Sequence, residues 1–246
     1  MPNSKNIIIL SEKSSGSSAC QNLLAKFSNI QHVSKTRHFQ NETLYWIKAA
    51  SMLDKPQLKM VDSEVPIERE KARTDLITLL RDNLDDWEPP DNDKELIMAG
   101  WRLMCQKHSP ILIEKSPHHL CQWSAIELII ELISNIKDVD FLLIGLIRNP
   151  MDTIYSQYKR WKSSPKKVEK QWFVAYQNLL KLRDVIGEQL VIIRYAETVE
   201  LAGKYGYQRD ELSNDKHVLW SVAGRLFNAM SSAVSSIKKF ARNKQR

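Results

Sequence analysis

Glycine is scarce in this chain of 246 residues, where it occurs only seven times, well below the roughly 7 % of average usage. Gly16 is the only glycine before Gly100. This shortage excludes collagen-like chains, and the hydrophobic share of 43 % excludes wholesale disorder. A chain of this length can bury a full core without disulfide or metal staples. We therefore expect a single domain over residues 1–246.

Cysteine and long apolar runs are also rare. Cys20, Cys105 and Cys121 are an odd number of widely spaced cysteines without a C-x-x-C pair, which argues against a zinc site or a disulfide framework. The longest apolar stretch, 141–147, is far below the roughly 20 residues of a spanning helix, and the run at 7–10 is too short for a signal peptide. We expect a cytoplasmic protein without a membrane span and without a metal.

The basic excess of +7 is unevenly distributed. Residues 148–170 contain seven basic and two acidic side chains, residues 225–246 contain six basic and no acidic ones, and residues 62–95 contain twelve acidic against five basic ones. A nucleic-acid face is typically a broad basic stripe with interleaved aromatics. Separate clusters instead favour an anionic small ligand, and we expect no nucleic-acid partner. The acidic, proline-containing stretch at about 55–95 has no strand pattern and predicts a helical insertion.

Apolar runs without alternation predict buried strands, which belong in sheets covered by helices on both faces. Amphipathic helical patterns lie between these runs. The alternation predicts an α/β fold, doubly wound, with a central, mostly parallel sheet in a three-layer architecture like that of P-loop NTPases. The expected strands are 7–10, a run around Val33, 111–113, 141–147 and 190–193; the expected helices are 18–27, 42–53, 67–84, 94–107, 118–134, 152–161, 168–185 and 211–240.

A phosphate-binding loop is predicted directly after the first strand. A turn from a strand into a helix offers free backbone N–H groups at the positive end of the helix dipole. Gly16 lets the backbone approach an anion closely, and Lys13 supplies a positive charge. The neighbouring serines add hydroxyl donors, although serines here could instead form an ordinary helix cap. The candidate loop residues are Lys13, Ser14, Ser15, Gly16, Ser17 and Ser18.

This loop differs from the loop that binds ATP or GTP. That pattern is G-x-x-x-x-G-K-[ST], whereas Ser11 replaces its first glycine here and Ser17 stands in the place of its lysine. No expected strand ends in an aspartate suited to Mg²⁺: Glu114 follows one strand and Arg148 another. A P-loop kinase of small molecules is therefore the weaker alternative, together with a non-catalytic module that binds nucleotides or nucleic acid.

A second anion site is predicted where the strand at 141–147 ends. Arg148 leaves the carboxyl end of this strand, the edge where ligands bind in open α/β sheets. Pro150 is favourable at the first position of a helix, and Ser156 lies about two turns into that helix. A guanidinium with a hydroxyl group is a donor set suited to a phosphate monoester.

Taken together, the two motifs resemble those of sulfotransferases. The loop Lys-Ser-Ser-Gly-Ser-Ser at 13–18 is similar to the family's K-[ST]-G-G-T-[ST], and Arg-Asn-Pro-x(5)-Ser-x-Tyr at 148–158 follows its R-[DN]-P-x(5)-S-x-[YF]. The resemblance implies a sulfuryl donor, 3′-phosphoadenosine 5′-phosphosulfate (PAPS), as co-substrate. Its 5′-phosphosulfate would lie on the first loop and its 3′-phosphate at Arg148 and Ser156. It also implies that Lys13 stabilises the leaving group.

Candidates for the acceptor side follow from the same resemblance. An acceptor hydroxyl needs a base within hydrogen-bond reach, and we name His38, Glu42 and, third, His118 or His119 for this role. Lys115 is a further candidate for contact with the sulfate or the acceptor. The segment Glu-Lys-Ser-Pro at 114–117 resembles a motif of carbohydrate sulfotransferases, which favours a small-molecule acceptor of carbohydrate type.

Overall fold

The computed structural model describes residues 4–196 of the chain. The expected helix at 211–240 and the basic C-terminal segment lie outside these residues. The strands are β1 (Ser4–Ser11), β2 (Ile30–His32), β3 (Ile111–Lys115), β4 (Val139–Ile147) and β5 (Leu190–Arg194). The α-helices are α1 (Ser17–Leu24), α2 (Tyr45–Met52), α3 (Arg69–Asn83), α4 (Asp93–Lys107), α5 (Trp123–Asn135), α6 (Pro150–Trp161) and α7 (Pro165–Ile186). Short 3₁₀ turns are η1 (Phe39–Asn41), η2 (His119–Cys121) and η3 (Gly187–Gln189).

The five strands form one sheet in the order β2-β3-β1-β4-β5, and every pair is parallel. Ile8, Ile9 and Leu10 of the central strand β1 are fully buried, as expected for a strand covered on both faces. The predicted α/β fold is thereby confirmed. Asn6 in this strand is polar and fully buried: its side chain donates to the Leu112 carbonyl at 3.1 Å and accepts from Trp101 Nε1 at 2.9 Å.

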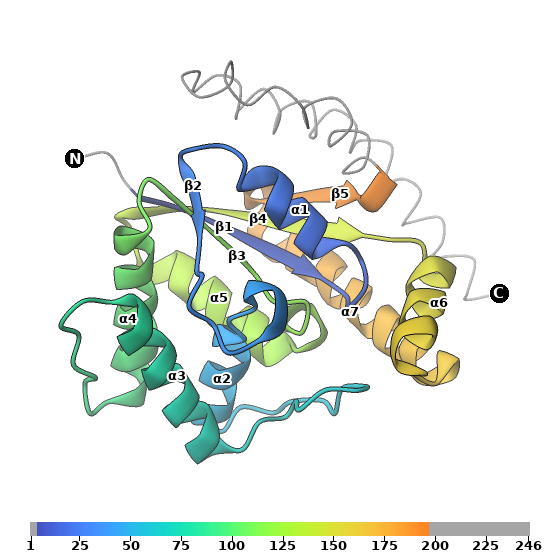
Figure 1. Ribbon diagram of the computed structural model, residues 1–246, viewed down its shortest axis with the longest axis horizontal. Helices are drawn as coiled ribbons and strands as arrows, with labels where there is room; N and C mark the ends of the chain where they lie inside the picture. Colours follow the sequence, from blue (N-terminus) through green and yellow to red (C-terminus); the bar gives the residue numbers. More distant parts are fainter. Residues whose placement is uncertain (1–3, 197–246) are drawn as a thin grey trace.

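Helices cover the sheet on both faces. Helix α1 lies on one face, and α4, α5 and α7 lie on the other (Figure 1). This division follows from right-handed crossovers. After β1 the chain moves to the β2 edge of the sheet, and from β2 onward it moves toward the β5 edge. An aromatic cluster of Tyr45, Trp46 and Trp101, with ring centroids 4.6 to 5.3 Å apart, packs α2 against α4.

The predicted acidic insertion contains α3, which packs on α2, and Leu76 and Leu80 of this helix are fully buried. Its carboxylates form ion pairs with nearby bases, such as Arg73 with Asp93 at 2.9 Å. Between α2 and α3 the chain has no regular structure among residues 55–68. In Figure 1 this cyan segment extends toward α6 and α7.

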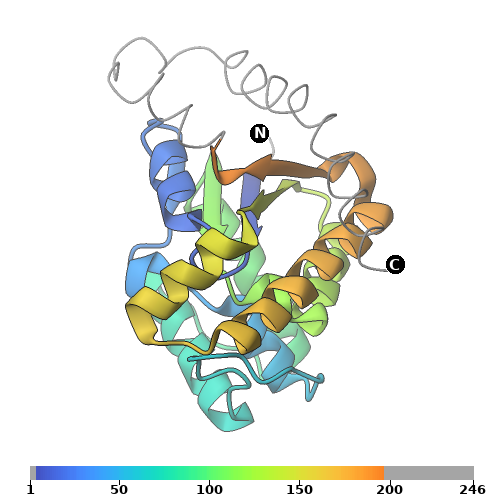
Figure 2. The ribbon, with the colours of Figure 1, turned by 90° about the vertical axis from the view of Figure 1, so that its right-hand side faces the viewer.

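The carboxyl ends of the parallel strands lie at one edge of the sheet. There the loop after β1, Lys115 at the end of β3, Arg148 after β4 and Tyr195 after β5 come together, as the register Ile9 with Lys115 and Ile147 with Arg194 requires. Figure 2 shows α6 and α7 beside this edge. The two predicted anion sites therefore belong to one region.

Candidate active site

The loop between β1 and α1 makes a tight turn that places glycine where an anion-binding backbone needs it. Ser14 has φ 62° and Gly16, which caps α1, has φ 89°. A Cβ at Gly16 would lie 2.3 Å from ring atoms of Tyr195. Both the backbone angle and the neighbouring ring thus demand glycine here. Helix α1 begins at Ser17 with its N–H groups at this turn, which is the arrangement that binds phosphate-like anions.

The serines of the loop have different partners. The main-chain carbonyl of Ser14 accepts a hydrogen bond from Arg148, and Ser15 Oγ lies 3.3 Å from the Tyr176 hydroxyl. Ser17 is buried. The hydroxyl of Ser18 instead donates to Gln40 Oε1 at 2.6 Å. The predicted loop residues therefore share one turn, although their side chains do not all point into it.

Lys13 is buried, with only 6 % of its surface exposed. Its Nζ donates to the carbonyls of Val61 and Asp62, both at 2.9 Å, and lies 4.8 Å from the ring centre of Trp161. Burial lowers the pKa of Lys13, while the charges of Glu12, Asp62 and Glu42 act in the opposite direction. The ammonium is thus held at a defined place beside the loop.

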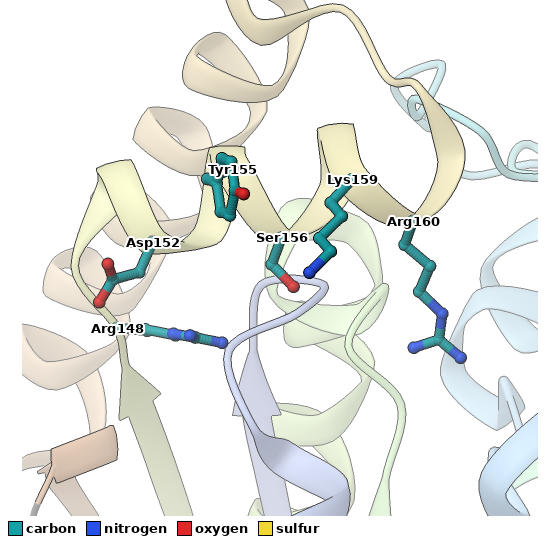
Figure 3. A pocket seen from close by; sticks show the side chains of 6 residues that line it. All are labelled: Arg148, Asp152, Tyr155, Ser156, Lys159 and Arg160. Carbon is teal, nitrogen blue, oxygen red and sulfur yellow. The ribbon is translucent and has the colours of Figure 1, made fainter.

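The predicted second anion site coincides with a pocket of about 550 Å³ that is lined by Arg148 and by residues of α6. Arg148 Nη1 donates to the Ser14 carbonyl at 2.9 Å, and its guanidinium lies 4.6 Å from the ring centre of Tyr195. Figure 3 shows Arg148, Ser156 and Lys159 directed toward the loop that follows β1. Three cationic side chains and one carboxylate line this pocket, namely Arg148, Lys159, Arg160 and Asp152, together with Tyr155 and Ser156.

Lys159 and Arg160 were not among the predicted site residues. A signal for them exists, because Ser156, Lys159 and Arg160 are three and four positions apart on a helix that Pro150 begins. Such residues lie on one helix face. The side chain of Asn149 caps this helix by accepting from the Met151 N–H at 2.9 Å.

The acceptor-side candidates divide into two groups. Glu42 Oε1 accepts from Lys115 Nζ at 2.9 Å, and Glu42 Oε2 lies 3.7 Å from His118 Nδ1. Lys115 is fully buried. Burial lowers the pKa of His118 to about 3, so this imidazole is neutral near pH 7. His38 belongs to the other group: its Nδ1 lies 3.6 Å from Glu64 Oε1.

The helix expected from residue 42 begins at Tyr45 instead. Leu44 has φ 49°, and its N–H donates to Ser116 Oγ at 3.0 Å, so the chain is bound to the end of β3 before it turns into α2. Glu42 therefore lies outside the helix. The side chains of His38 and Glu42 nevertheless both line a small cavity.

Glu114 supports this arrangement and was not predicted as a site residue. Its Oε1 accepts from Thr43 Oγ1 at 2.8 Å and from Ser116 Oγ at 2.6 Å, which ties the residues around Glu42 to β3. Burial raises the pKa of Glu114 to about 7. Its second oxygen lies 3.7 Å from Nδ1 of the fully buried His119.

Among residues 4–196, no helix combines the length and the apolar character needed to cross a membrane. The same part of the chain contains no group of three or more His, Cys, Asp or Glu side chains that could hold a metal ion.

Two solved structures of sulfotransferases are similar to this chain. The fold is similar to that of a sulfotransferase domain from the curacin biosynthetic pathway, with 18 % identity, a TM-score of 0.51, and 83 % of this chain and 71 % of that one covered. Sulfotransferase STF9 from Mycobacterium avium has 14 % identity and a TM-score of 0.42, with 94 % and 69 % covered. No curated protein has a significantly similar sequence.

A family model described as the sulfotransferase family matches residues 6–202. This range begins in β1 and includes the loop at Lys13, the residues around Glu42 and the pocket at Arg148. It extends over far more than half of the chain. The protein therefore belongs to the sulfotransferase family.

Proposed function

We propose that the protein is an enzyme that transfers the sulfuryl group of PAPS to an acceptor hydroxyl. The observation that carries this proposal is the hydrogen bond of 2.9 Å between Arg148 Nη1 and the Ser14 carbonyl. It places a cationic pocket directly beside a helix-terminal anion loop. A nucleotide with a 3′-phosphate and a 5′-phosphosulfate carries two anionic groups that match these two neighbouring sites.

Each end of the donor finds suitable partners. The 5′-phosphosulfate fits the N–H groups at the start of α1, where the helix dipole favours an anion. The 3′-phosphate fits the pocket, where the planar guanidinium of Arg148 can bind two oxygens at once. Ser156 adds a hydroxyl donor, and Lys159 and Arg160 add positive charge.

The chemical step requires stabilisation of a departing phosphate. The acceptor oxygen attacks sulfur in line, the bond between sulfur and the bridging oxygen breaks, and 3′-phosphoadenosine 5′-phosphate (PAP) leaves. Negative charge develops on the bridging oxygen, where the Lys13 ammonium and the N–H groups of the loop would stabilise it. The burial of Lys13 strengthens this interaction, because charges attract more strongly where water is excluded.

We assign the acceptor proton to the carboxylate of Glu42. The charge of Glu42 acts on Lys13, so the carboxylate lies near the ammonium that would stabilise the leaving group. The hydrogen bond from Lys115 orients it. His38, the other candidate from the sequence, pairs with Glu64 instead, which favours Glu42 over His38 as the base.

A hydroxyl-rich acceptor of carbohydrate type suits the polar surroundings of Glu42. Charged and hydroxyl side chains predominate there, and such groups orient polar ligands by hydrogen bonds. The polar residues of this region are Lys35, Thr36, Arg37, His38, Glu42, Thr43, Lys48, Asp75 and Asp82.

Titration calorimetry with PAP, ADP and Mg·ATP on one sample tests the donor assignment. We expect PAP to bind at least about tenfold more tightly than ADP, because each charge-assisted hydrogen bond to the 3′-phosphate contributes about 1.5–3 kcal/mol. Arg148→Ala should abolish most of this preference while leaving ADP affinity nearly unchanged. The matched control is Arg102→Ala, which removes an arginine of α4 that pairs with Asp138.

Two outcomes would contradict the proposal. Equal affinities for PAP and ADP would show that the protein does not recognise the 3′-phosphate. Tighter binding of Mg·ATP than of PAP would favour the P-loop kinase. With PAP binding established, transfer of label from radioactive PAPS to a panel of sugars and other alcohols identifies the acceptor class.

A further inference from the structure

The buried carboxylate of Glu12, next to Lys13 in the loop, is the most unusual group near the candidate active site. Its Oε1 accepts from Gln171 Nε2 of α7 at 2.6 Å and from Gln157 Nε2 of α6 at 3.2 Å. Its Oε2 accepts from Cys121 Sγ at 2.8 Å. Burial raises the pKa of Glu12, and these donors oppose that shift. The described contacts thus tie the loop to α6, α7 and η2.

Gln171 connects this carboxylate to the segment over Lys13. While its Nε2 donates to Glu12, its Oε1 accepts from the Val61 N–H at 2.8 Å. The two contacts define the orientation of the amide, because a main-chain N–H can only donate. We call residues 57–62 the strap, since they pass from α2 to Lys13 and α7.

The strap is bound at three further places. The main chain of Leu58 exchanges two hydrogen bonds with the side chain of Gln122, at 2.7 and 2.8 Å. The side chain of Gln57 is bound to the Ile47 carbonyl and to Ser51, both at 2.9 Å. Ser163, between α6 and α7, donates to the carboxylate of Asp62. These contacts anchor the strap on either side of Val61, whose own N–H is held by Gln171.

The hydrogen bonds close a ring. Glu12 accepts from Gln171, Gln171 accepts from Val61, and the carbonyl of Val61 accepts from Lys13, the residue after Glu12. We propose that Gln171 is a positioning residue for sulfuryl transfer, which acts through Glu12 and the strap to hold the Lys13 ammonium where the leaving oxygen develops charge. The catalytic part of this inference rests on the proposed function, whereas the placement of the ammonium does not.

Burial explains why such a ring is needed. A lysine side chain has four rotatable bonds and about 2 kcal/mol of rotamer entropy, so a buried ammonium needs fixed acceptors to remain in one position. Main-chain carbonyls suit this role because they accept hydrogen bonds without adding another full charge. An error of about 1 Å in the placement of a catalytic group can cost roughly a hundredfold in rate.

The first test measures the position of Lys13 without any activity. The variant Gln171→Met retains the length of the side chain and loses both hydrogen bonds. We expect the rate at which an amine-reactive reagent labels Lys13, followed by mass spectrometry, to rise about fivefold or more as the ammonium loses its fixed acceptors. Lys170, an exposed lysine on α7, serves as the internal reference, and Gln177→Met, on the exposed side of the same helix, is the matched control. An unchanged labelling rate for Lys13 would overturn the proposal.

A second variant separates the ring from general damage to the fold. Gln171→Glu preserves the acceptor for the Val61 N–H but faces Glu12 with a second carboxyl group. The two carboxyls can be joined only through a shared proton. Relative to wild type at the same pH, labelling of Lys13 should therefore be near normal at low pH and rise as the pH increases. If the ratio of the Lys13 labelling rates in Gln171→Glu and wild type did not depend on pH, the ring of hydrogen bonds would be contradicted, even if Gln171→Met failed to fold.

Kinetics then test the catalytic part. In Gln171→Met we expect kcat to fall about tenfold or more, while the affinity for PAP changes less than about threefold because the Arg148 pocket is untouched. In a Lys13→Ala background, Gln171→Met should lower kcat almost no further, because the effects of substitutions at coupled residues are not additive. Full additivity would refute the catalytic role. If labelling of Lys13 were unchanged in Gln171→Met while PAP still bound, the role of Gln171 would be refuted and the proposed function would stand. If PAP did not bind, the proposed function would be refuted, and the labelling result would still decide the placement of the ammonium.

Discussion

Gly16 has a backbone angle that disfavours side chains and a neighbour that leaves no room for one. With φ 89° and a Cβ position 2.3 Å from the Tyr195 ring, Gly16→Ala must both adopt a strained conformation and displace the ring. We expect a loss of about 1–2 kcal/mol in the free energy of unfolding from the left-handed backbone. The affinity for PAP should fall about tenfold or more, because the loop N–H groups shift.

The control for this prediction is Gly187→Ala. Gly187 also has a positive φ, 57°, but its Cβ position has nothing within 4 Å. It should therefore show the backbone strain without the loss of PAP affinity. Thermal unfolding and calorimetry measure the two effects separately. Equal PAP affinity in Gly16→Ala and wild type would mean that the loop backbone does not contact the donor.

At the scale of elements, the strand-to-helix turns could be predicted and the contacts between distant segments could not. The loop after β1 and the Arg148 motif are local signals, since each combines an apolar strand with a polar turn and a helix start. The ring through Gln171 joins residues separated by 110 and 159 positions. No periodicity or spacing in one sequence reports such pairs.

The region between His38 and α2 illustrates a second limit. The sequence pattern predicts a helix from residue 42, but Gln40, Asn41 and Leu44 have φ values of 58°, 58° and 49°. These angles are uncommon for residues other than glycine, and sequence patterns give little warning of them. The hydrogen bonds of Glu114 and Ser116 to this segment stabilise the irregular course.

Glu114 connects the end of β3 to the start of α2 and predicts a pH-dependent stability. Its pKa is about 7 in the folded protein against the ordinary 4.5, so between these values the folded state retains a proton that the unfolded chain has lost. The stabilisation is complete below about pH 4.5 and disappears as the pH rises through 7. Glu114→Gln keeps an acceptor for Thr43 and Ser116 and removes this titration.

Urea unfolding of wild type and Glu114→Gln across this range tests the assignment. The free energy of unfolding of the wild type, relative to the variant, should fall by about 3 kcal/mol from low to neutral pH. His118, whose pKa is lowered to about 3, has the opposite pH dependence, but it is present in both proteins and cancels. Parallel stability curves would show that Glu114 does not titrate here.

At the scale of the whole molecule, the net charge is +7, and acidic and basic side chains are distributed differently in two regions. Several acidic residues of the predicted insertion are paired with bases, as in the contacts of Arg69 with Asp93 at 3.2 Å and of Lys71 with Asp75 at 2.9 Å. The pocket at Arg148 instead combines three cations with the single carboxylate of Asp152. Positive charge is thus concentrated where the 3′-phosphate is proposed to bind.

This concentration predicts a specific dependence on salt. Raising the ionic strength from about 0.05 to 0.3 M shortens the range of electrostatic attraction about 2.4-fold, so PAP affinity should fall by about an order of magnitude while ADP affinity falls less. Calorimetry at several salt concentrations measures both slopes, and Arg148→Ala should make the PAP slope resemble that of ADP. A short single-stranded oligonucleotide should not displace PAP at any salt concentration, because one compact pocket cannot follow a polyanionic backbone. Displacement with a slope steeper than that of PAP would instead identify a nucleic-acid-binding module, since such slopes grow with the number of phosphates contacted.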